Sequence, residues 1–310
     1  MKILVTGGAG FIGSHIVDAY IADGHEVVVL DNLSTGSRKN LNPKAKFIEL
    51  DICSPKAAEA IGREHPDVLN HHAAQIDVRV SVANPVSDIK INVTGLINLM
   101  EAGRQAGLKK VIFASSGGTV YGEQREFPAT EEHSTWPISP YGLNKLMCEK
   151  YLHYYQVQYE IPYVVLRYAN IYGPRQNPHG EAGVVSIFIE KMLKGETPVI
   201  NGDGRQTRDY VYVGDVVEAN RLTLLDNARG AYNVGTGVET DVNAIFHALR
   251  EYSGSNCKEI HGLAKKGEQK RSSISSAKIE RELGWHPQVS FFDGMKRTAE
   301  WFRNNTTSPL

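Results

Sequence analysis

The fold of this chain is decided by one stretch near its start, KILVTGGAGFIG at residues 2–13. Residues 2–6 are apolar and predict a buried strand, and a glycine-rich run follows that strand at once. Residues 14–23 have helical spacing, and residues 26–31 predict a second strand that ends in Asp31. The stretch therefore predicts a strand, glycine loop, helix and strand in the order that binds dinucleotides.

Each part of this unit has a chemical reason. Glycines at positions 7, 10 and 13 permit a tight turn and let the backbone approach a pyrophosphate. The start of the helix adds N–H groups and the positive end of its dipole. Asp31 can accept hydrogen bonds from both ribose hydroxyls and would repel a 2′-phosphate, so the sequence favours NAD over NADP.

Strand-like runs alternate with helical patterns from residue 2 to about residue 170, which predicts an α/β fold with a Rossmann-type, doubly wound parallel sheet. Ligands of such sheets lie beyond the carboxyl ends of the strands. The glycine loop and Asp31, Asp51-Ile52, Ala73 and residues 115–119 all fall there.

The pattern loosens after residue 170. We expect an NAD-binding domain at residues 1–170 and a smaller α+β substrate domain at residues 171–310, some of whose segments can pack back on the first. Two local predictions are a continuous helix over residues 89–107 and a hairpin turn at residues 201–204.

Composition excludes several classes of function. The chain has 310 residues and a formal net charge of −1, so its charge supports neither a nucleic-acid nor a membrane-surface partner. Its apolar runs are too short to span a bilayer, and no signal peptide is expected. Three widely spaced cysteines, Cys53, Cys148 and Cys257, suit a reducing cytoplasm and predict no metal site.

A second stretch carries the candidate chemistry. Ser139 can cap a helix whose first turn holds Pro140, which places Tyr141 and Lys145 four residues apart on one helix face. A tyrosine that acts as a base needs a nearby cation, because its ordinary pKa near 10 keeps it protonated at neutral pH. Tyr141 is therefore the candidate base and Lys145 its electrostatic partner.

Taken together, these residues resemble the extended short-chain dehydrogenase/reductase family, and within it the UDP-glucose (UDP-galactose) 4-epimerases. The resemblance runs over nearly the whole chain. It rests on residues 6–14, Asp31-Asn32-Leu33, Tyr141 with Lys145, Asn170 before Tyr172-Gly173, Arg208-Asp209-Tyr210 and Glu282-Leu283-Gly284-Trp285.

The resemblance implies NAD-dependent inversion at C4 of a UDP-hexose through a 4-keto intermediate. Tyr141 would take the proton of the sugar 4′-hydroxyl while hydride passes to a tightly bound NAD+ and later returns to the other face of the sugar. The implied cofactor contacts are Gly7, Gly10, Phe11, Ile12, Gly13, Asp31, Asn32, Ser34, Thr35, Gly36, Asp51, Ile52, Ala73, Ala74, Gln75, Asn92, Ser115, Tyr141, Lys145 and Tyr168.

The resemblance also implies a set of substrate contacts. Arg208 and Arg271 are the best candidates for the diphosphate, with Lys265 as a possible extra, because cations and amides bind phosphate oxygens. Val199 and Asn201 would bracket the uracil, and Glu268 could hold the uridine ribose. The complete set is Gly117, Gly118, Thr119, Tyr141, Asn170, Val184, Val199, Asn201, Arg208, Glu268 and Arg271.

One position departs from the family pattern. The family usually has a serine or threonine where this chain has Gly117. The hydroxyl that bonds the sugar oxygen must then come from Ser116, from Thr119 or from water. We favour Thr119 as a third catalytic residue, because in a strand-like run it points to the same side as residue 117.

Alternatives remain open. A UDP-glucuronate 4-epimerase or decarboxylase, another nucleotide-sugar epimerase, or a non-catalytic NAD-binding sensor or scaffold fits part of the pattern. A 4,6-dehydratase is disfavoured, since the resemblance would then require an Asp-Glu pair where Gly117-Gly118 stand. Ser272 falls where relatives restricted to plain hexoses often have tyrosine, so UDP-GlcNAc and UDP-GalNAc are possible further substrates.

The helix that begins at Tyr141 is apolar on more than one side, at residues 143–157. A helix of this kind is usually buried on both faces. We therefore expect a homodimer in which the equivalent helix of a second subunit covers the outer face.

Overall fold

The computed structural model describes residues 1–179, 183–264 and 269–306 of the chain. Its largest unit is a seven-stranded parallel sheet in the order β10-β6-β5-β4-β1-β2-β3. Its strands are β1 (Lys2–Thr6), β2 (Glu26–Asp31), β3 (Lys46–Glu49), β4 (Val68–His71), β5 (Lys110–Ser116), β6 (Tyr163–Tyr168) and β10 (Gly230–Val234). The Rossmann-type sheet expected from the sequence is confirmed.

Helices cover both faces of this sheet. On one face lie α1 (Phe11–Ala22), α8 (Val213–Leu222) and α10 (Ala277–Leu283). On the other lie α2 (Pro55–Glu64), α5 (Gly95–Gln105) and α6 (Pro140–Tyr159). The two apolar cores explain why the inner strands read as continuous apolar runs, since a parallel sheet is buried on both sides.

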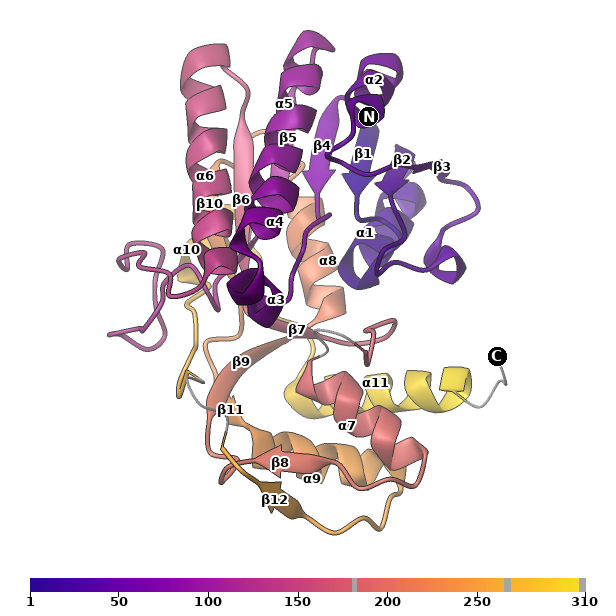
Figure 1. Cartoon of the computed structure of the whole chain (residues 1–310), viewed down its shortest axis with the longest axis vertical. Helices are drawn as coiled ribbons and strands as arrows, with labels where there is room; N and C mark the ends of the chain where they lie inside the picture. Colours follow the sequence, from indigo (N-terminus) through magenta and orange to yellow (C-terminus); the bar gives the residue numbers. More distant parts are fainter. Residues whose placement is uncertain (180–182, 265–268, 307–310) are drawn as a thin grey trace.

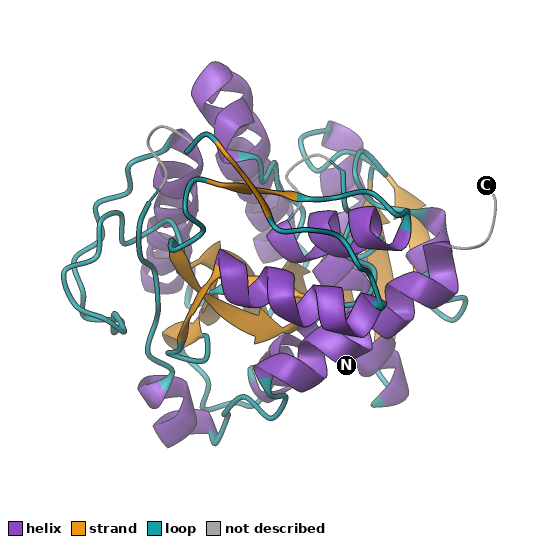
Figure 2. Ribbon diagram, turned by 90° about the horizontal axis from the view of Figure 1, so that it is seen from below, coloured by secondary structure: helices purple, strands orange, loops and turns teal. Residues whose placement is uncertain are grey.

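A smaller lobe lies below the carboxyl edge of the sheet (Figure 1). Its core is formed by α7 (Val184–Leu193), α9 (Val242–Ser253) and α11 (Phe291–Thr306). Viewed from this lobe, helices lie in front of the strands of the large sheet (Figure 2). Two small sheets complete the chain: β7 (Asn170–Tyr172), β9 (Thr207–Tyr212) and β11 (Glu239–Asp241), and β8 (Val199–Asn201) with β12 (Ile260–Gly262).

Segments beyond residue 170 pack back on the sheet. The edge strand β10 is one of them, and α8 is another. A buried amide of α8 ties it to the sheet, because Asn220 accepts a hydrogen bond from Asn70 Nδ2 at 3.0 Å. Trp285 is 1% exposed and donates from Nε1 to the carbonyl oxygen of Asp215, which fixes α8 from its other end.

Two local predictions are wrong. β8 pairs in parallel with β12 and not with β9, because both edges of β9 are taken by β7 and β11. The residues from 201 to 204 turn the chain, with positive φ at Gly202 and Gly204, without forming a hairpin.

The expected continuous helix at residues 89–107 is also broken. It is divided into α4 (Pro85–Ile89), a π-helical turn η2 (Lys90–Thr94) and α5. Sequence reasoning missed α4 and the preceding α3 (Val78–Ala83), although both carry start signals. Asp77 caps α3, and Asn84 caps α4 just before Pro85.

The described residues contain no helix that is long and apolar enough to cross a membrane. They also contain no group of three or more His, Cys, Asp or Glu residues with metal-binding geometry. Cys53, Cys148 and Cys257 are free thiols.

Candidate active site

The glycine loop forms a cradle with no room for side chains. A Cβ at Gly7 would lie 2.7 Å from the backbone nitrogen of Ala73, and Gly7 has a φ of +69°. A Cβ at Gly13 would lie 2.3 Å from the carbonyl oxygen of Gly7. These contacts explain the glycines, since only glycine permits both the turn and the close approach of α1.

Asp31 ends β2 directly beside this loop. Its carboxylate accepts from the backbone N–H of Ala9 at 3.0 Å and of Leu33 at 2.8 Å, and the residue is 7% exposed. The loop that follows bonds back to Ala9, whose carbonyl oxygen accepts from Ser37 N and Asn40 Nδ2. Asp31 therefore organises the cradle, and its contact with ribose remains a prediction.

The segment after β3 lies beside Asn32. Asp51 accepts from the N–H of Cys53 at 2.8 Å and from Asn32 Nδ2 at 3.4 Å. Ile52 is buried against Gly95, where a Cβ would lie 2.7 Å from its Cδ1. The structure thus places Asn32 in contact with Asp51, and the cofactor contacts of Asn32, Asp51 and Ile52 remain a prediction.

The segment after β4 is held by a pair of amides. Gln75 N donates to Asn92 Oδ1 at 2.9 Å, and Asn92 Nδ2 donates to the Gln75 carbonyl oxygen at 3.0 Å. Asn92 is 2% exposed, so its amide holds Gln75 in place. Its direct contact with the cofactor remains a prediction.

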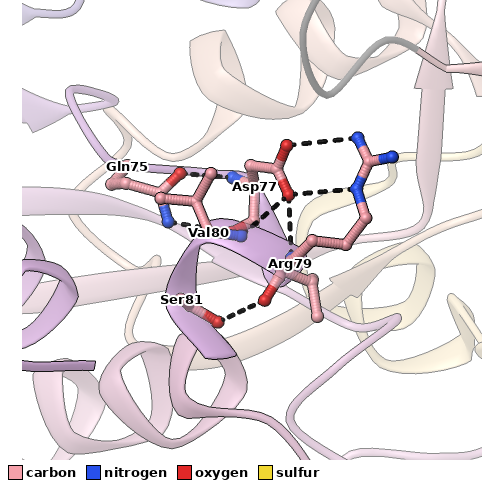
Figure 3. A network of polar contacts seen from close by, with 6 residues as sticks. Gln75, Asp77, Arg79, Val80 and Ser81 are labelled. Atoms are coloured by element: carbon pink, nitrogen blue, oxygen red, sulfur yellow. Dashed lines mark hydrogen bonds and ion pairs between the residues drawn. The ribbon is translucent and has the colours of Figure 1, made fainter. Parts of the chain in front are cut away.

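Figure 3 shows how the same segment continues into α3. The side-chain oxygen of Gln75 accepts from Asp77 N, and Asp77 accepts from the N–H groups of Arg79 and Val80. Ser81 in α3 then accepts from the backbone N–H of Tyr141 at 3.2 Å. The segment after β4 is therefore linked through α3 to the first turn of α6.

Helix α6 begins as the sequence predicts. Ser139 Oγ accepts from the N–H of Gly142, and Pro140 occupies the first turn. Lys145 is 4% exposed, and its Nζ donates to the Ala114 carbonyl oxygen at 2.8 Å. Its Nζ also lies 5.7 Å from the centre of the Tyr141 ring and 4.8 Å from that of Phe113.

Burial lowers the pKa of Lys145 to about 8, although nearby Cys148, Asp88 and Glu149 oppose the shift. The ammonium is therefore present below this pH and is lost as the pH rises through it. Phe113 and Tyr141 favour the charged form, because an aromatic face attracts a cation. The predicted pair of phenol and ammonium is thus assembled in the structure.

Two neutral histidines complete this region. Burial lowers the pKa of both His71 and His72 to about 3, and the charge of Lys145 acts in the same direction. Thr6 Oγ1 bonds His71 Nδ1 at 2.7 Å, and the Tyr168 hydroxyl bonds His72 Nε2 at 3.2 Å. The hydroxyl of Tyr168 is therefore hydrogen-bonded within the protein, and its contact with the cofactor remains a prediction.

Ser115 is likewise engaged within the protein. Its hydroxyl donates to Glu149 Oε1 at 2.6 Å, and Glu149 forms a buried ion pair with Arg167 at 2.6 Å. Arg167 Nη1 in turn donates to the Tyr121 hydroxyl. The contact of the Ser115 hydroxyl with the cofactor stays a prediction, and in the structure that hydroxyl bonds this ion pair.

The space at Gly117 is filled by Ile274. A Cβ at Gly117 would lie 2.6 Å from Ile274 Cδ1, and Ile274 is 1% exposed. Gly235 lines the other side of Ile274, where a Cβ would lie 2.7 Å from Cγ1. The missing side chain at position 117 is therefore replaced by an isoleucine from a distant segment.

Thr119 does not lie on a strand with Gly117, and this part of its prediction is wrong. β5 ends at Ser116, and residues 117–121 form turns in which Val120 N donates to the Ser116 carbonyl oxygen. The Thr119 hydroxyl is nevertheless buried, and in the described part of the chain it has no hydrogen-bond partner. It retains the capacity to bond a ligand.

Backbone pairing sets the two segments that carry the candidate arginines for the diphosphate side by side. Residues 270–272 run beside β9, with Thr207 N bonded to Lys270 O and Asp209 N to Ser272 O. Arg208 donates to the Thr207 carbonyl oxygen. Arg271 pairs with Glu239 at 2.5 Å and lies over the Phe127 ring, so phosphate binding would have to compete with that carboxylate.

The remaining substrate candidates lie on several elements. Asn170 begins β7, and its Oδ1 would lie 3.7 Å from a Cβ at Gly118. Val184 begins α7, while Val199 and Asn201 bound β8. Glu268 and Lys265 lie outside the described residues.

Residues 3–235 match the NAD-dependent epimerase/dehydratase family. The chain belongs to this family. A putative UDP-glucose 4-epimerase of Methanocaldococcus jannaschii is 50% identical to this family member, over 98% of this chain and 99% of the relative.

Two solved structures of the family are also similar. The UDP-glucose 4-epimerase of Thermotoga maritima with UDP-glucose has a TM-score of 0.96 and 46% identity, over 99% of this chain and 100% of that one. The UDP-glucose 4-epimerase of Thermus thermophilus with NAD has a TM-score of 0.94 and 44% identity, over 98% of this chain and 100% of that one.

NAD is the cofactor of this family member, and the residues present fit it. The cradle at Gly7 and Gly13 is free of side chains, and the N-terminus of α1 lies beside it. Asp31 at the end of β2 and Asp51 just after β3 carry carboxylates that suit the ribose hydroxyls of NAD, and their contact with it is a prediction. Lys145 and Tyr141 lie near the end of β5, and their contact with the nicotinamide is a prediction.

The complementarity of Gly117 and Ile274 is testable by unfolding in urea. Gly117→Ser should cost about 1–3 kcal/mol through overpacking. Ile274→Ala should cost about 2–5 kcal/mol through the cavity it leaves. Combined, the two changes should cost less than their sum, because the serine partly fills that cavity.

Gly118→Ser is the matched control, since its nearest atom would lie at an ordinary contact distance of 3.7 Å. It should leave stability nearly unchanged. Strict additivity of the Gly117 and Ile274 changes would contradict the interpretation.

Proposed function

We propose that this protein is an epimerase that inverts C4 of a UDP-hexose, interconverting UDP-glucose and UDP-galactose. The observation that carries the proposal is the contact of the buried Lys145 ammonium with the Tyr141 ring, at the cofactor end of the sheet. The similarity to UDP-glucose 4-epimerases over nearly the whole chain supports the same reaction.

The roles follow from the site. Bound NAD supplies the acceptor and donor of hydride. Tyr141 takes the proton of the sugar 4′-hydroxyl and later returns one to the same oxygen. Lys145 stabilises the phenolate through its charge, which burial strengthens by excluding water.

The surroundings keep this proton transfer local. His71 and His72 remain neutral at neutral pH, so neither competes as a cation or as a protonated donor. Glu149 is neutralised by Arg167, so it does not remove charge from the lysine through an ion pair. Gly117 and Gly118 carry neither acid nor base, which disfavours elimination of water as the reaction.

Substrate binding is assigned to the small lobe. Arg208 and Arg271 supply cations for the diphosphate, and Asn170 lies beside Gly118 near the sugar end. Ser272 has a small side chain at the position where relatives restricted to plain hexoses often have tyrosine, which supports acceptance of a 2-acetamido group. UDP-GlcNAc and UDP-GalNAc are therefore included as substrates.

The decisive experiment supplies the purified protein with UDP-glucose and no added NAD. We expect UDP-galactose to form, and UDP-GlcNAc to be turned over in a parallel sample, measured by anion-exchange chromatography. Tyr141→Phe should lower turnover by roughly a hundredfold to ten-thousandfold, because the proton acceptor is lost.

The matched control is Tyr159→Phe at the end of the same helix, since Tyr159 is 42% exposed and its change should not affect turnover. Failure with both glucose and galactose nucleotides, with NAD added, would exclude the proposed reaction. Failure with UDP-GlcNAc alone would exclude only the wider substrate range.

Thr119 is proposed to supply the hydroxyl that Gly117 lacks. Its buried and unpartnered Oγ1 supports this role among the described residues, since a buried hydroxyl is normally hydrogen-bonded. Thr119→Val keeps the shape and removes the bond, so turnover should fall by roughly tenfold, the equivalent of one hydrogen bond. Thr130→Val, at an exposed loop position, is the control.

The assignment of Thr119 fails if Thr119→Val keeps full turnover while Tyr141→Phe loses it. Ser116 or a water would then be the remaining candidates for this hydroxyl role.

A homodimer through α6 is also proposed. Leu143, Met147, Tyr154 and Val157 are 38–61% exposed and repeat every three to four residues, or multiples of that spacing, along this helix. A stripe with this spacing is typical of a helix that packs against a second one. The net charge of the chain is only −1, so repulsion between two copies would be weak.

Met147→Glu combined with Val157→Glu should give a monomer in sedimentation analysis, because two buried carboxylates would face their own copies. Gln158→Glu, on an exposed position of the same helix, should remain dimeric. A wild-type monomer at micromolar concentration would contradict the proposal.

A further inference from the structure

Asp88 is a buried carboxylate that has no direct role in the proposed reaction. It lies in α4, the short helix that sequence reasoning missed, and is 1% exposed. A carboxylate buried to this extent is costly unless hydrogen bonds replace the water that it has lost. Its environment therefore has to supply donors.

Three side-chain amides supply them. Asp88 Oδ1 accepts from Gln75 Nε2 at 2.7 Å and from Asn92 Nδ2 at 3.2 Å. Asp88 Oδ2 accepts from Asn144 Nδ2 at 2.6 Å. Three converging donors require a group that only accepts, which an ionised carboxylate is and an amide is not.

These donors belong to two different parts of the active site. Gln75 lies in the segment that passes the glycine cradle, where Ala73 approaches Gly7. Asn144 lies in the first turns of α6, between Tyr141 and Lys145. Asp88 is thus a single group bonded both to the cofactor loop and to the catalytic helix.

Asp88 also acts on the charge of Lys145. The titratable and charged groups around Lys145 are Tyr141, Cys148 and Glu149 on α6, Asp88 on α4, and His71 and His72 at the end of β4. The histidines are neutral and Glu149 is paired with Arg167. Among the described residues no lysine or arginine forms an ion pair with Asp88, whose bonds go to neutral amides.

We infer that Asp88 is a positioning residue of this active site: it fixes the first turns of α6, which carry Tyr141 and Lys145, relative to the cofactor loop, and its negative charge favours the ammonium of Lys145. The inference rests on the proposed function for its effect on turnover. Its electrostatic part concerns the protein alone.

The test is Asp88→Asn, which keeps the shape and removes the charge. The pH at which Lys145 titrates should fall by about one pH unit, because a nearby opposite charge is lost. The titration is followed by NMR with lysine isotopically labelled at the ε-carbon, and the Lys145 signal is assigned by its absence in Lys145→Met. This measurement needs no substrate.

Turnover should change in parallel. In Asp88→Asn kcat should fall by roughly tenfold to a hundredfold, since a small misplacement of reacting groups has effects of this size. The alkaline limb of the pH profile of kcat should move to lower pH. KM should change less, because the hydrogen bonds of Asp88 go to none of the proposed substrate residues.

A second variant separates this role from loss of folding. In Asp88→Asn with Asn144→Asp, the carboxylate and the amide exchange places across the 2.6 Å contact. The amide introduced at position 88 could still accept from Gln75 and Asn92 through its oxygen, and the negative charge stays near Lys145. Both the lysine titration and kcat should return toward those of the unmodified protein.

Asp215→Asn is the matched control, because Asp215 is 4% exposed and accepts from the N–H groups of Gln288 and Val289, far from Lys145 in the fold. It should lower thermal stability without moving the Lys145 titration. An unshifted titration in Asp88→Asn, or an equal shift in Asp215→Asn, overturns the inference.

The outcomes also separate the inference from the proposed function. A shifted titration in Asp88→Asn, with no epimerisation by the unmodified protein, would reject the proposed reaction and support the electrostatic role. Epimerisation by the unmodified protein, with an unchanged titration and an unchanged kcat in Asp88→Asn, would reject the inference alone.

Discussion

The burial of the Lys145 ammonium is the physical constraint on which the rest of this site depends. A lysine at 4% exposure loses most of its hydration, and the lowered pKa records that loss. The structure offsets it with the Ala114 carbonyl oxygen and two aromatic faces. Each of these groups is fixed by the large sheet or by α6, so the charge is placed by the core of the fold.

The parallel sheet explains why such a site can exist at this edge. Carboxyl ends of neighbouring strands converge there, and their loops carry the glycine cradle, Asp31 and the segment after β4. Buried side-chain bonds hold this edge of the sheet to the elements around it. Asn92, Asp88 and the pair of Glu149 with Arg167 are examples.

A residue from the second half of the chain fills a gap beside the loop that follows β5. Ile274 occupies the slot beside Gly117, and Asp209 on β9 accepts from the N–H groups of Thr236, Gly237 and Ile274. The carboxylate of Asp209 therefore fixes the segment that brings Ile274 to the loop after β5. The contact of Ile274 with Gly117 joins residues far apart in the chain, and no local sequence pattern indicates it.

The sequence alone determined the Rossmann-type sheet, the cradle and the pair of Tyr141 and Lys145. These depend on local rules: strand and helix periods, glycine at tight turns, and the cap at Ser139. Only the tertiary structure decided the pairing of β8 with β12, the filling of Gly117 by Ile274 and the contacts of Asp88. Each of these contacts joins residues far apart in the chain. A local sequence pattern reports only on residues close together in the chain, so it does not indicate which distant residue will pack against them.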